Sequence, residues 1–201
     1  MPAAPRLILA STSRYRRELL ERLRLPFEVE APGVDEASFA GESPAAAAQR
    51  LALAKAEAVA RRHPDAVVIG SDQVAELDGL AIGKPHTRER AVEQLRSMSG
   101  RRVSFHTAVA VVRRDRGFAR ADLAAVTVQF RQLDDAVIER YLALEQPYDC
   151  AGSAKAEALG IVLLASIESD DPTTLIGLPL IRTCALLREA GIDPLSVEWP
   201  P

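Results

Sequence analysis

Residues 66–73 read Ala-Val-Val-Ile-Gly-Ser-Asp-Gln, an apolar run that ends in small and polar residues. The run from Ala66 to Gly70 is typical of a buried strand. We expect Asp72, which follows this strand, to lie at the carboxyl edge of a sheet, where α/β proteins place their ligands. There Asp72 could hold a divalent metal or activate a water molecule. A turn-forming aspartate is also common at the end of a strand, and this stretch alone gives the two interpretations equal weight.

Strands and helices alternate around this stretch in the first half of the chain. Apolar runs predict further strands at residues 7–10, 27–31, 103–113, 118–132 and 159–166. Helical spacing, with cap and stop residues, predicts helices at 14–25, 44–62, 88–98, 134–144 and 178–190. Asp78-Gly79 predicts a hairpin turn, and the two long strands in the middle of the chain should form an antiparallel hairpin. The sequence therefore predicts an α/β fold with a mixed sheet.

The composition is that of a folded protein. The chain has 201 residues, of which 48% are apolar and 26% charged, and this suits one large domain or two tightly joined lobes. We find no separable linker and therefore predict a single domain over 1–201. No apolar run reaches the roughly 18 residues that a membrane-spanning helix needs. The apolar segment near the N-terminus is too short for a secretory signal, so we expect the protein in the cytoplasm.

The balance of charge limits the kind of partner. The net charge is −3, from 25 basic and 28 acidic residues. This balance argues against a polynucleotide partner, which usually needs a broad basic face. Local basic residues stand out against the acidic background, and they are Arg14, Arg16, Arg17, Lys84 and Lys155. They favour a small polyanion as the ligand.

Residues 11–17 read Ser-Thr-Ser-Arg-Tyr-Arg-Arg and place hydroxyl groups and arginines at the start of a predicted helix. Free backbone N–H groups and the helix dipole favour an anion at such a position. The arginines could add bidentate hydrogen bonds to phosphate. The plain alternative is an N-cap followed by a solvated basic helix face, and the pattern alone weighs the two equally. The segment is not a Walker loop, because it has no Gly-rich run and no Lys-Ser/Thr pair.

Polar residues in other segments could join such a site. Lys84 could neutralise phosphate charge, and Lys155 and Glu157 would share one side of an extended segment. Solvated surface loops are the plain alternative for both segments. The remaining polar candidates are the acids Asp35 and Glu36 and the helix residue Lys55. The histidines and cysteines form no pattern typical of a zinc site or of a nucleophile.

Taken together, these motifs resemble the Maf family of nucleotide pyrophosphatases, over residues 7 to about 190. They are, in order, Leu-Ala-Ser-Thr-Ser-Arg-Tyr-Arg-Arg at 9–17, Val-Asp-Glu at 34–36, Arg-Leu-Ala-Leu-Ala-Lys-Ala at 50–56, Gly-Ser-Asp-Gln-Val at 70–74, Gly-Lys-Pro at 83–85, Ala-Gly-Ser-Ala-Lys-Ala-Glu at 151–157 and Gly-Leu-Pro-Leu at 177–180. An ordered set of this size is much more specific than any one of its members.

The resemblance implies a fold, a cofactor and roles for individual residues. The fold would be like that of inosine triphosphate pyrophosphatases, an elongated mixed sheet with flanking helices and a cleft between two lobes. A divalent cation, Mg²⁺ or Mn²⁺, and often a homodimer would accompany it. By the resemblance, Asp72 is the catalytic acid that deprotonates the attacking water, and Glu36 and Asp72 face the metal. The residues that would line the phosphate end are Ser11, Arg16, Lys55, Lys84 and Lys155.

Within the family, the chain resembles the branch that acts on 7-methylguanosine triphosphate. Gln73 follows the catalytic acid where the dTTP/UTP branch carries threonine, and Glu157 stands where that branch carries glutamine. Tyr15 keeps an aromatic face where the methylguanosine branch usually has tryptophan. Such a face suits a cationic 7-methylguanine ring, and a carboxylate can accept both N–H donors of the guanine Watson–Crick edge.

Three functions are consistent with these residues. The resemblance implies hydrolysis of 7-methyl-GTP to 7-methyl-GMP and pyrophosphate, which would remove modified nucleotides before they reach nucleic acid. One alternative is the same reaction with dTTP and UTP as substrates. The other is a role without important catalysis, as a nucleotide-binding regulator of septum formation.

Overall fold

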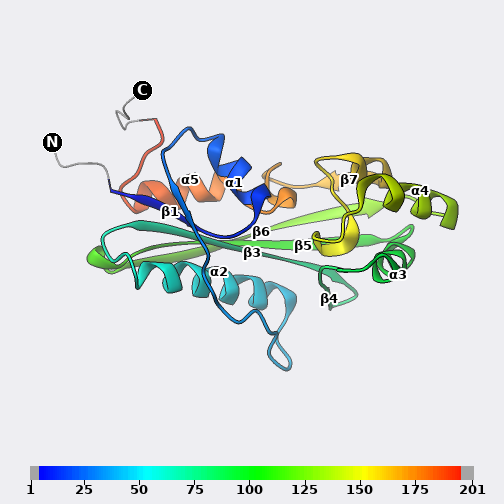
Figure 1. The fold of residues 1–201 in the computed structure, drawn as a ribbon, viewed down its shortest axis with the longest axis horizontal. Coiled ribbons are helices and arrows are strands. Elements are labelled where there is room, and N and C mark those ends of the chain that lie inside the picture. The colour runs from blue at the N-terminus through cyan, green and yellow to red at the C-terminus, as the bar shows by residue number, and fades with distance from the viewer. Residues whose placement is uncertain (1–4, 196–201) are drawn as a thin grey trace.

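A computed structural model describes residues 5–195 of the chain (Figure 1). Its strands are β1 (Leu7–Ala10), β2 (Glu28–Glu30), β3 (Val67–Leu77), β4 (Leu80–Ile82), β5 (Arg102–Arg113), β6 (Phe118–Phe130) and β7 (Leu164–Glu168). Its α-helices are α1 (Arg14–Glu21), α2 (Pro44–Ala60), α3 (Arg88–Met98), α4 (Asp135–Glu145) and α5 (Leu180–Glu189). Short 3-10 helices are η1 (Arg114–Arg116), η2 (Ala151–Ser153), η3 (Leu159–Leu163) and η4 (Thr174–Ile176). None of the helices in this part of the chain has both the length and the apolar character that crossing a bilayer requires.

The strands of the described region form one mixed sheet, in the order β2-β1-β3-β5-β6-β7, with β4 paired to β3. Strand β1 runs parallel to both β2 and β3. The long strands β3, β5 and β6 pair antiparallel with one another, and β7 pairs antiparallel with β6. The turn at Asp78-Gly79 joins β3 to β4, and both of its residues have a positive φ. The predicted α/β class, with an elongated mixed sheet and flanking helices, is confirmed.

Helices cover both faces of the sheet, and the apolar clusters that they form with it define two lobes. Helix α2 lies on one face, and α1 and α5 lie on the other (Figure 1). Small residues of α2 and leucines of α1 and α5 pack on β1, β3 and β5, and we call this part the first lobe. A separate apolar cluster joins α3 and α4 to the opposite ends of the long strands, and we call this part the second lobe. Strands β3, β5 and β6 run through both lobes.

Most helices follow the prediction at their N-termini. Four of them begin with a side chain that accepts a hydrogen bond from a backbone N–H of the first turn, and these side chains are Ser13, Ser43, Thr87 and Asp134. Helix α1, however, ends at Glu21 and not at the predicted residue 25. The positive φ of Arg24, 55°, is incompatible with a continuing helix, and Pro26 follows it closely.

Strand β3 is longer than predicted, and this changes the position of the key acid. The strand continues to Leu77, so Asp72 lies inside it and not directly after it. The reason is that antiparallel β5 pairs with β3 as far as Glu76. The neighbouring strand β1 ends at Ala10, opposite Gly70. Asp72 therefore still lies just beyond the last parallel pair, where the sheet is uncovered on the β1 side.

The predicted strand at 159–166 is a strand only at its end. Leu159–Leu163 form the 3-10 helix η3, and β7 begins at Leu164. Gly160 permits this, because a Cβ at this position would lie 2.5 Å from backbone atoms of Lys155. The chain therefore packs closely on the preceding turn here, and only then extends along β6.

Gly70 lets α2 lie directly on β3. A Cβ at Gly70 would lie 2.2 Å from the carbonyl oxygen of Ala52 and 2.6 Å from the backbone nitrogen of Ala56. We expect Gly70→Ala to lower the free energy of unfolding, measured in denaturant, by at least the ~1–3 kcal/mol typical of an overpacked core. Gly83→Ala is the matched control, because a Cβ at Gly83 meets nothing within 4 Å. Equal stability of the two variants would contradict this packing.

Candidate active site

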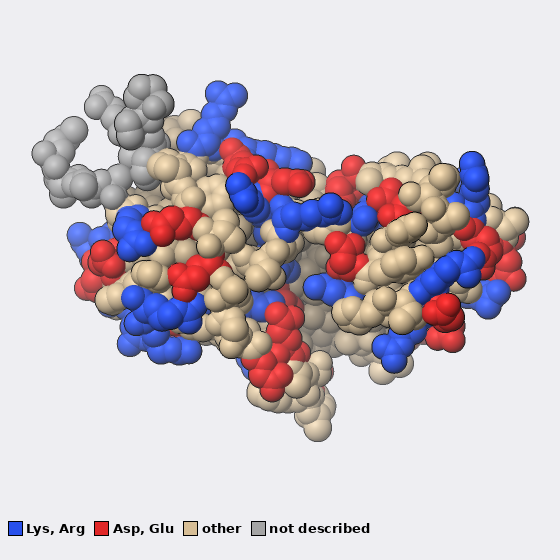
Figure 2. All heavy atoms as spheres, in the orientation of Figure 1, with Lys and Arg blue, Asp and Glu red and all other residues tan. Residues whose placement is uncertain are grey.

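A cleft of about 820 Å³ opens where the two lobes meet. Figure 2 shows the hollow in the middle of one face, with acidic and basic side chains around it. Its walls come from residues 11–16, from α2, from the middle of β3 and from the segments 149–157 and 175–177. The polar stretch of β3 lies here because the apolar residues before it belong to the first-lobe core and those after it to the second-lobe core.

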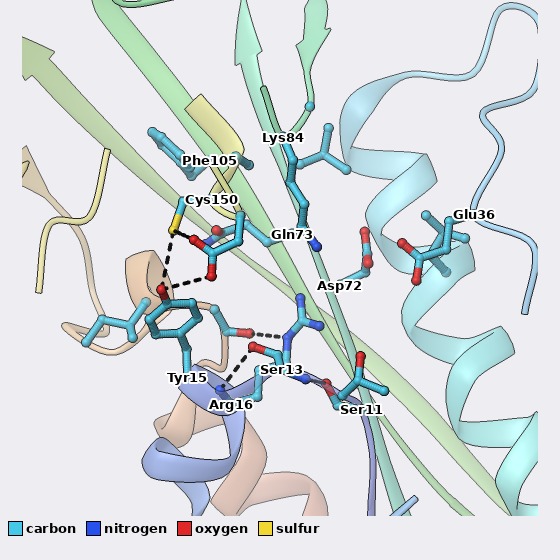
Figure 3. A pocket seen from close by; sticks show the side chains of 18 of the residues that line it. Ser11, Ser13, Tyr15, Arg16, Glu36, Asp72, Gln73, Lys84, Phe105 and Cys150 are labelled. Atoms are coloured by element: carbon cyan, nitrogen blue, oxygen red, sulfur yellow. Dashed lines mark hydrogen bonds between the residues drawn. The ribbon is translucent and has the colours of Figure 1, made fainter. Parts of the chain in front are cut away.

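One wall of the cleft is the turn between β1 and α1. Ser11 is buried, and its hydroxyl accepts a hydrogen bond from the backbone N–H of Ser13 at 3.1 Å. The Nε of Arg16 donates to the carbonyl oxygen of Gly177 at 2.9 Å, so the rest of the guanidinium points into the cleft (Figure 3). The turn thus places a fixed cation beside the start of a helix, an arrangement that suits an anion.

Three charged side chains meet on the α2 face of β3. Lys55 is 4% exposed, and its Nζ donates to Oδ1 of Asp72 at 2.6 Å and lies 2.8 Å from Oε1 of Glu36. Burial acts to raise the pKa of the Glu36 carboxyl. The hydrogen bond from Lys55 and the nearby charges of Lys84 and Arg16 outweigh burial, so that this pKa is lowered overall. Burial in turn lowers the pKa of Arg16, and the charges of Asp72 and Glu36 oppose that change.

The same end of the cleft has the donor set for a divalent cation that arrives with phosphate. Lys84, in the loop after β4, points across the cleft toward Asp72 (Figure 3). Within residues 5–195, no three Asp, Glu, His or Cys side chains gather closely enough to hold a metal on their own. Glu36 and Asp72 each use one carboxylate oxygen on Lys55 and each have a second oxygen. One or two carboxylates, completed by phosphate oxygens and water, commonly hold Mg²⁺, so these residues fit such an ion.

The other end of the cleft has an aromatic ring among polar groups. Tyr15, in the first turn of α1, donates its hydroxyl to Oδ2 of Asp149 at 3.2 Å and accepts from Nη2 of Arg14 at 2.8 Å. Burial raises the pKa of Tyr15 well above its ordinary value, so the hydroxyl keeps its proton. Glu157 lies in a turn and not in the predicted extended segment. Burial raises the pKa of its carboxyl, opposed by its own backbone hydrogen bond and by the charge of Lys155.

Gln73 and Asp72 are neighbours in the sequence but point to opposite faces of β3, as successive residues of a strand do. The Nε2 of Gln73 lies 2.9 Å from Oγ1 of Thr107, and 3.0 and 3.1 Å from the carbonyl oxygens of Thr174 and Leu175. These three acceptors surround the amide nitrogen, so the amide oxygen is the atom left for a ligand. Both residues line the cleft.

Lys155 does not line the cleft, whereas the other predicted site residues do. It is 7% exposed, and its Nζ lies 3.3 Å from Oε1 of Glu145 and 4.0 Å from Oδ1 of Asp149. The predicted residues that line the cleft are Ser11, Tyr15, Arg16, Glu36, Lys55, Asp72, Gln73, Lys84 and Glu157. Sequence reasoning missed Asp149, although it immediately precedes the predicted 151–157 motif. It also missed the pairing of Lys155 with Glu145, which lies outside the cleft on α4.

Comparisons with known proteins found a matching family and several relatives of this chain. A family model described as Maf-like protein matches residues 6–190. A 7-methyl-GTP pyrophosphatase from Polaromonas sp. is 64% identical over 191 residues, which are 95% of this chain and 87% of that protein. One from Albidiferax ferrireducens is 63% identical, over 97% of this chain and 98% of that protein. Among solved structures, the Staphylococcus aureus Ham1 protein matches with a TM-score of 0.45 and 19% identity, over 62% of this chain and 71% of that chain.

The family match covers every motif of the cleft, from residue 9 to residue 180, and the named relatives share more than half of their residues with this chain. The resemblance inferred from the sequence is thereby confirmed, and the chain belongs to the Maf-like family.

Proposed function

We propose that this protein hydrolyses 7-methyl-GTP to 7-methyl-GMP and pyrophosphate. The relatives from Polaromonas sp. and Albidiferax ferrireducens are named for that activity. The observation that carries the proposal is the division of the cleft into a cationic end around Asp72 and an aromatic, acidic end around Tyr15 and Glu157. A 7-methylguanosine triphosphate has matching ends, a polyanionic tail and a cationic base.

At the cationic end, Arg16, Lys55 and Lys84 provide the positive charge that a triphosphate needs. Asp72 takes a proton from the water that attacks the α-phosphorus. As the new P–O bond forms, the bond to the leaving pyrophosphate breaks, and the three cations stabilise the charge that leaves with it. Lys55 fixes the Asp72 carboxylate through the 2.6 Å hydrogen bond to Oδ1, which leaves the two lone pairs of Oδ2, one for the water and one for a cation.

A divalent cation, Mg²⁺ or Mn²⁺, belongs to this proposal. Glu36 and Asp72 would hold it, because both carboxylates meet at Lys55 and each has an oxygen to spare. Such an ion, when bound, neutralises charge on the phosphate oxygens and makes the phosphorus easier to attack.

At the other end, the ring of Tyr15 offers a face for a cationic base, a contact worth about 0.5–2 kcal/mol. The Glu157 carboxylate can accept both N–H donors of a guanine edge. A uracil or thymine presents one donor between two acceptors there, and those acceptors would face the negative charge of the Glu157 carboxylate without a hydrogen bond, at a cost. The proposed preference for the methylated purine follows from these two contacts.

A panel of nucleotides tests the proposal. Pyrophosphate release would be measured with 7-methyl-GTP, GTP, UTP and dTTP, each with Mg²⁺ or Mn²⁺. We expect the highest kcat/KM for 7-methyl-GTP. A preference for UTP or dTTP would favour the alternative substrate class, and binding without turnover would favour a nucleotide-binding regulator of septum formation.

Replacing Glu157 with Gln should weaken this preference. The amide has one acceptor oxygen and no charge, so 7-methyl-GTP should lose roughly 1–3 kcal/mol of transition-state stabilisation. UTP and dTTP should lose less, or gain, in kcat/KM. An equal loss for all four substrates would contradict the role of Glu157 in base selection.

The substrate preference of the wild type and of Glu157→Gln should also differ in its dependence on pH. Burial raises the pKa of Glu157, so its carboxyl gains a proton at a higher pH than an ordinary glutamate does. The protonated form is a poorer acceptor, and the preference of the wild type should therefore decline as the pH falls through this raised pKa. Glu157→Gln should lack that decline.

We also propose that the protein acts in the cytoplasm on free nucleotides and not on polynucleotides, in keeping with its net charge of −3. Its role would then be to remove modified nucleotides before they reach nucleic acid. The homodimer that the family resemblance implies stays a prediction, which sedimentation would test.

A further inference from the structure

A chain of polar contacts crosses the base end of the cleft and joins its two walls, with Asp149 at its centre. Tyr15 on α1 donates to Oδ2 of Asp149 at 3.2 Å. The sulfur of Cys150 lies 3.4 Å from Oδ1 of Asp149, beside the Tyr15 hydroxyl (Figure 3). Burial raises the pKa of the Cys150 thiol to about 12, so the thiol stays protonated and can donate. On the other side, Nζ of Lys155 lies 4.0 Å from Oδ1 of Asp149.

On the side away from the cleft, Asp149 faces Lys155, which is itself bound by other groups. Lys155 pairs with Glu145 on α4, and its backbone N–H donates to the hydroxyl of Tyr141 at 3.1 Å. Glu145 also accepts from the backbone N–H of Leu159 at 3.2 Å. An anchored cation therefore stands next to Asp149, whose side chain is itself 57% exposed. The charge of Lys155 attracts the carboxylate from this side, while its hydrogen bonds come from Tyr15 and Cys150.

Tyr15 needs such a partner to serve as a stacking face. It lies in the first turn of an eight-residue helix and is half-buried. Arg14, on the same helix, lies over one face of the ring at 4.7 Å from its centroid and donates to its hydroxyl, so Asp149 is the contact that holds the ring from outside the helix. A ring that is already oriented loses less conformational freedom when the base binds. The contact with Asp149 ties the ring to the opposite wall of the cleft, beside the space in which the base would lie.

We propose that Asp149 is a positioning residue for base selection, which holds the Tyr15 ring in its stacking orientation through the phenolic hydroxyl. The proposal rests on the proposed function for the identity of the base. Lys155, predicted from the sequence to bind substrate, then acts one step removed, by anchoring Asp149.

A double-mutant cycle tests this role. Tyr15→Phe keeps the ring and removes the hydroxyl, and Asp149→Ala removes the acceptor. Each should lower kcat/KM for 7-methyl-GTP by roughly three- to tenfold, less than a buried hydrogen bond to a charged group contributes, because the pair is partly exposed. The loss should fall mainly on KM. The double variant should lose no more than Tyr15→Phe alone, since Tyr15→Phe already removes the contact with Asp149, together with the hydrogen bond from Arg14.

Two comparisons separate positioning from a general structural effect. Activity toward UTP should change little in all three variants. Asp65→Ala removes an exposed carboxylate that does not line the cleft, and it should leave both activities unchanged. Equal losses for 7-methyl-GTP and UTP would overturn the proposal. Losses that multiply in the double variant would also overturn it, because Asp149 would then act independently of Tyr15.

Binding of the product, 7-methyl-GMP, repeats the cycle without catalysis. Calorimetry on the wild type and the three variants should give the same non-additive pattern in the dissociation constants. If that pattern appears but the wild type releases no pyrophosphate, the positioning role stands and the proposed function fails. If the wild type hydrolyses 7-methyl-GTP and the cycle is additive, the function stands and the positioning role fails.

Discussion

Replacing Asp72 with Asn should reduce turnover by about 10²–10⁴-fold, the usual contribution of a general base. The amide keeps the shape of the side chain but cannot take a proton from the attacking water. Asp72 is 6% exposed, and its Oδ1 is engaged by Lys55, so bulk water has little access to serve as a substitute base. The measurement is kcat for pyrophosphate release at saturating 7-methyl-GTP.

The fold should survive this substitution. Removing one partner of a buried ion pair usually leaves an uncompensated charge, but Lys55 keeps a second carboxylate, Glu36, at 2.8 Å. Circular dichroism should therefore match the wild type. Asp65→Asn, at an exposed position outside the cleft, is the matched control. A folded Asp72→Asn protein with turnover within about threefold of wild type would reject Asp72 as the base.

Removal of divalent cations should abolish hydrolysis. Glu36 and Asp72 bring two carboxylates to the end of the cleft that receives the triphosphate, and without a bound cation they repel it. We expect no pyrophosphate release after treatment with EDTA and desalting. Addition of Mg²⁺ or Mn²⁺ should restore it, because oxygen ligands suit hard cations.

The metal requirement should depend on Glu36. Glu36→Gln should raise the Mg²⁺ concentration needed for half-maximal activity, whereas Asp65→Asn should not change it. Full activity after exhaustive chelation would reject the need for a cation. An unchanged Mg²⁺ requirement in Glu36→Gln would reject Glu36 as its ligand.

Elements with a local signal were the predictable part of the fold. The caps at Ser43 and Thr87 act within one helical turn, and the turn at Asp78-Gly79 needs only two residues. The length of β3 could not be predicted in the same way, because it is set by pairing with β5, far along the chain. The bend at Gly160 likewise depends on a close approach to another part of the backbone.

The residues of the candidate site also divide into those that a local motif predicts and those whose positions depend on distant parts of the chain. Asp72, Gln73 and Lys84 could be found because each belongs to a short motif. Lys155 belongs to such a motif too, but the direction of its side chain is decided by Glu145, on a helix that carries no motif. The position of Asp149 opposite α1 likewise arises only when the two lobes come together.

Strands β3, β5 and β6 pass without interruption from one lobe into the other. A nucleotide is therefore not admitted by a swivel at a connecting peptide, because rotating one lobe against the other would bend all three strands together and strain the hydrogen bonds between them. We therefore expect the sheet to stay rigid and the two lobes of the chain, proposed as a single domain, to keep their relative orientation when a nucleotide binds. The motion that admits the nucleotide is then left to side chains at the rim of the cleft, such as Lys84, while the sheet beneath them stays in place.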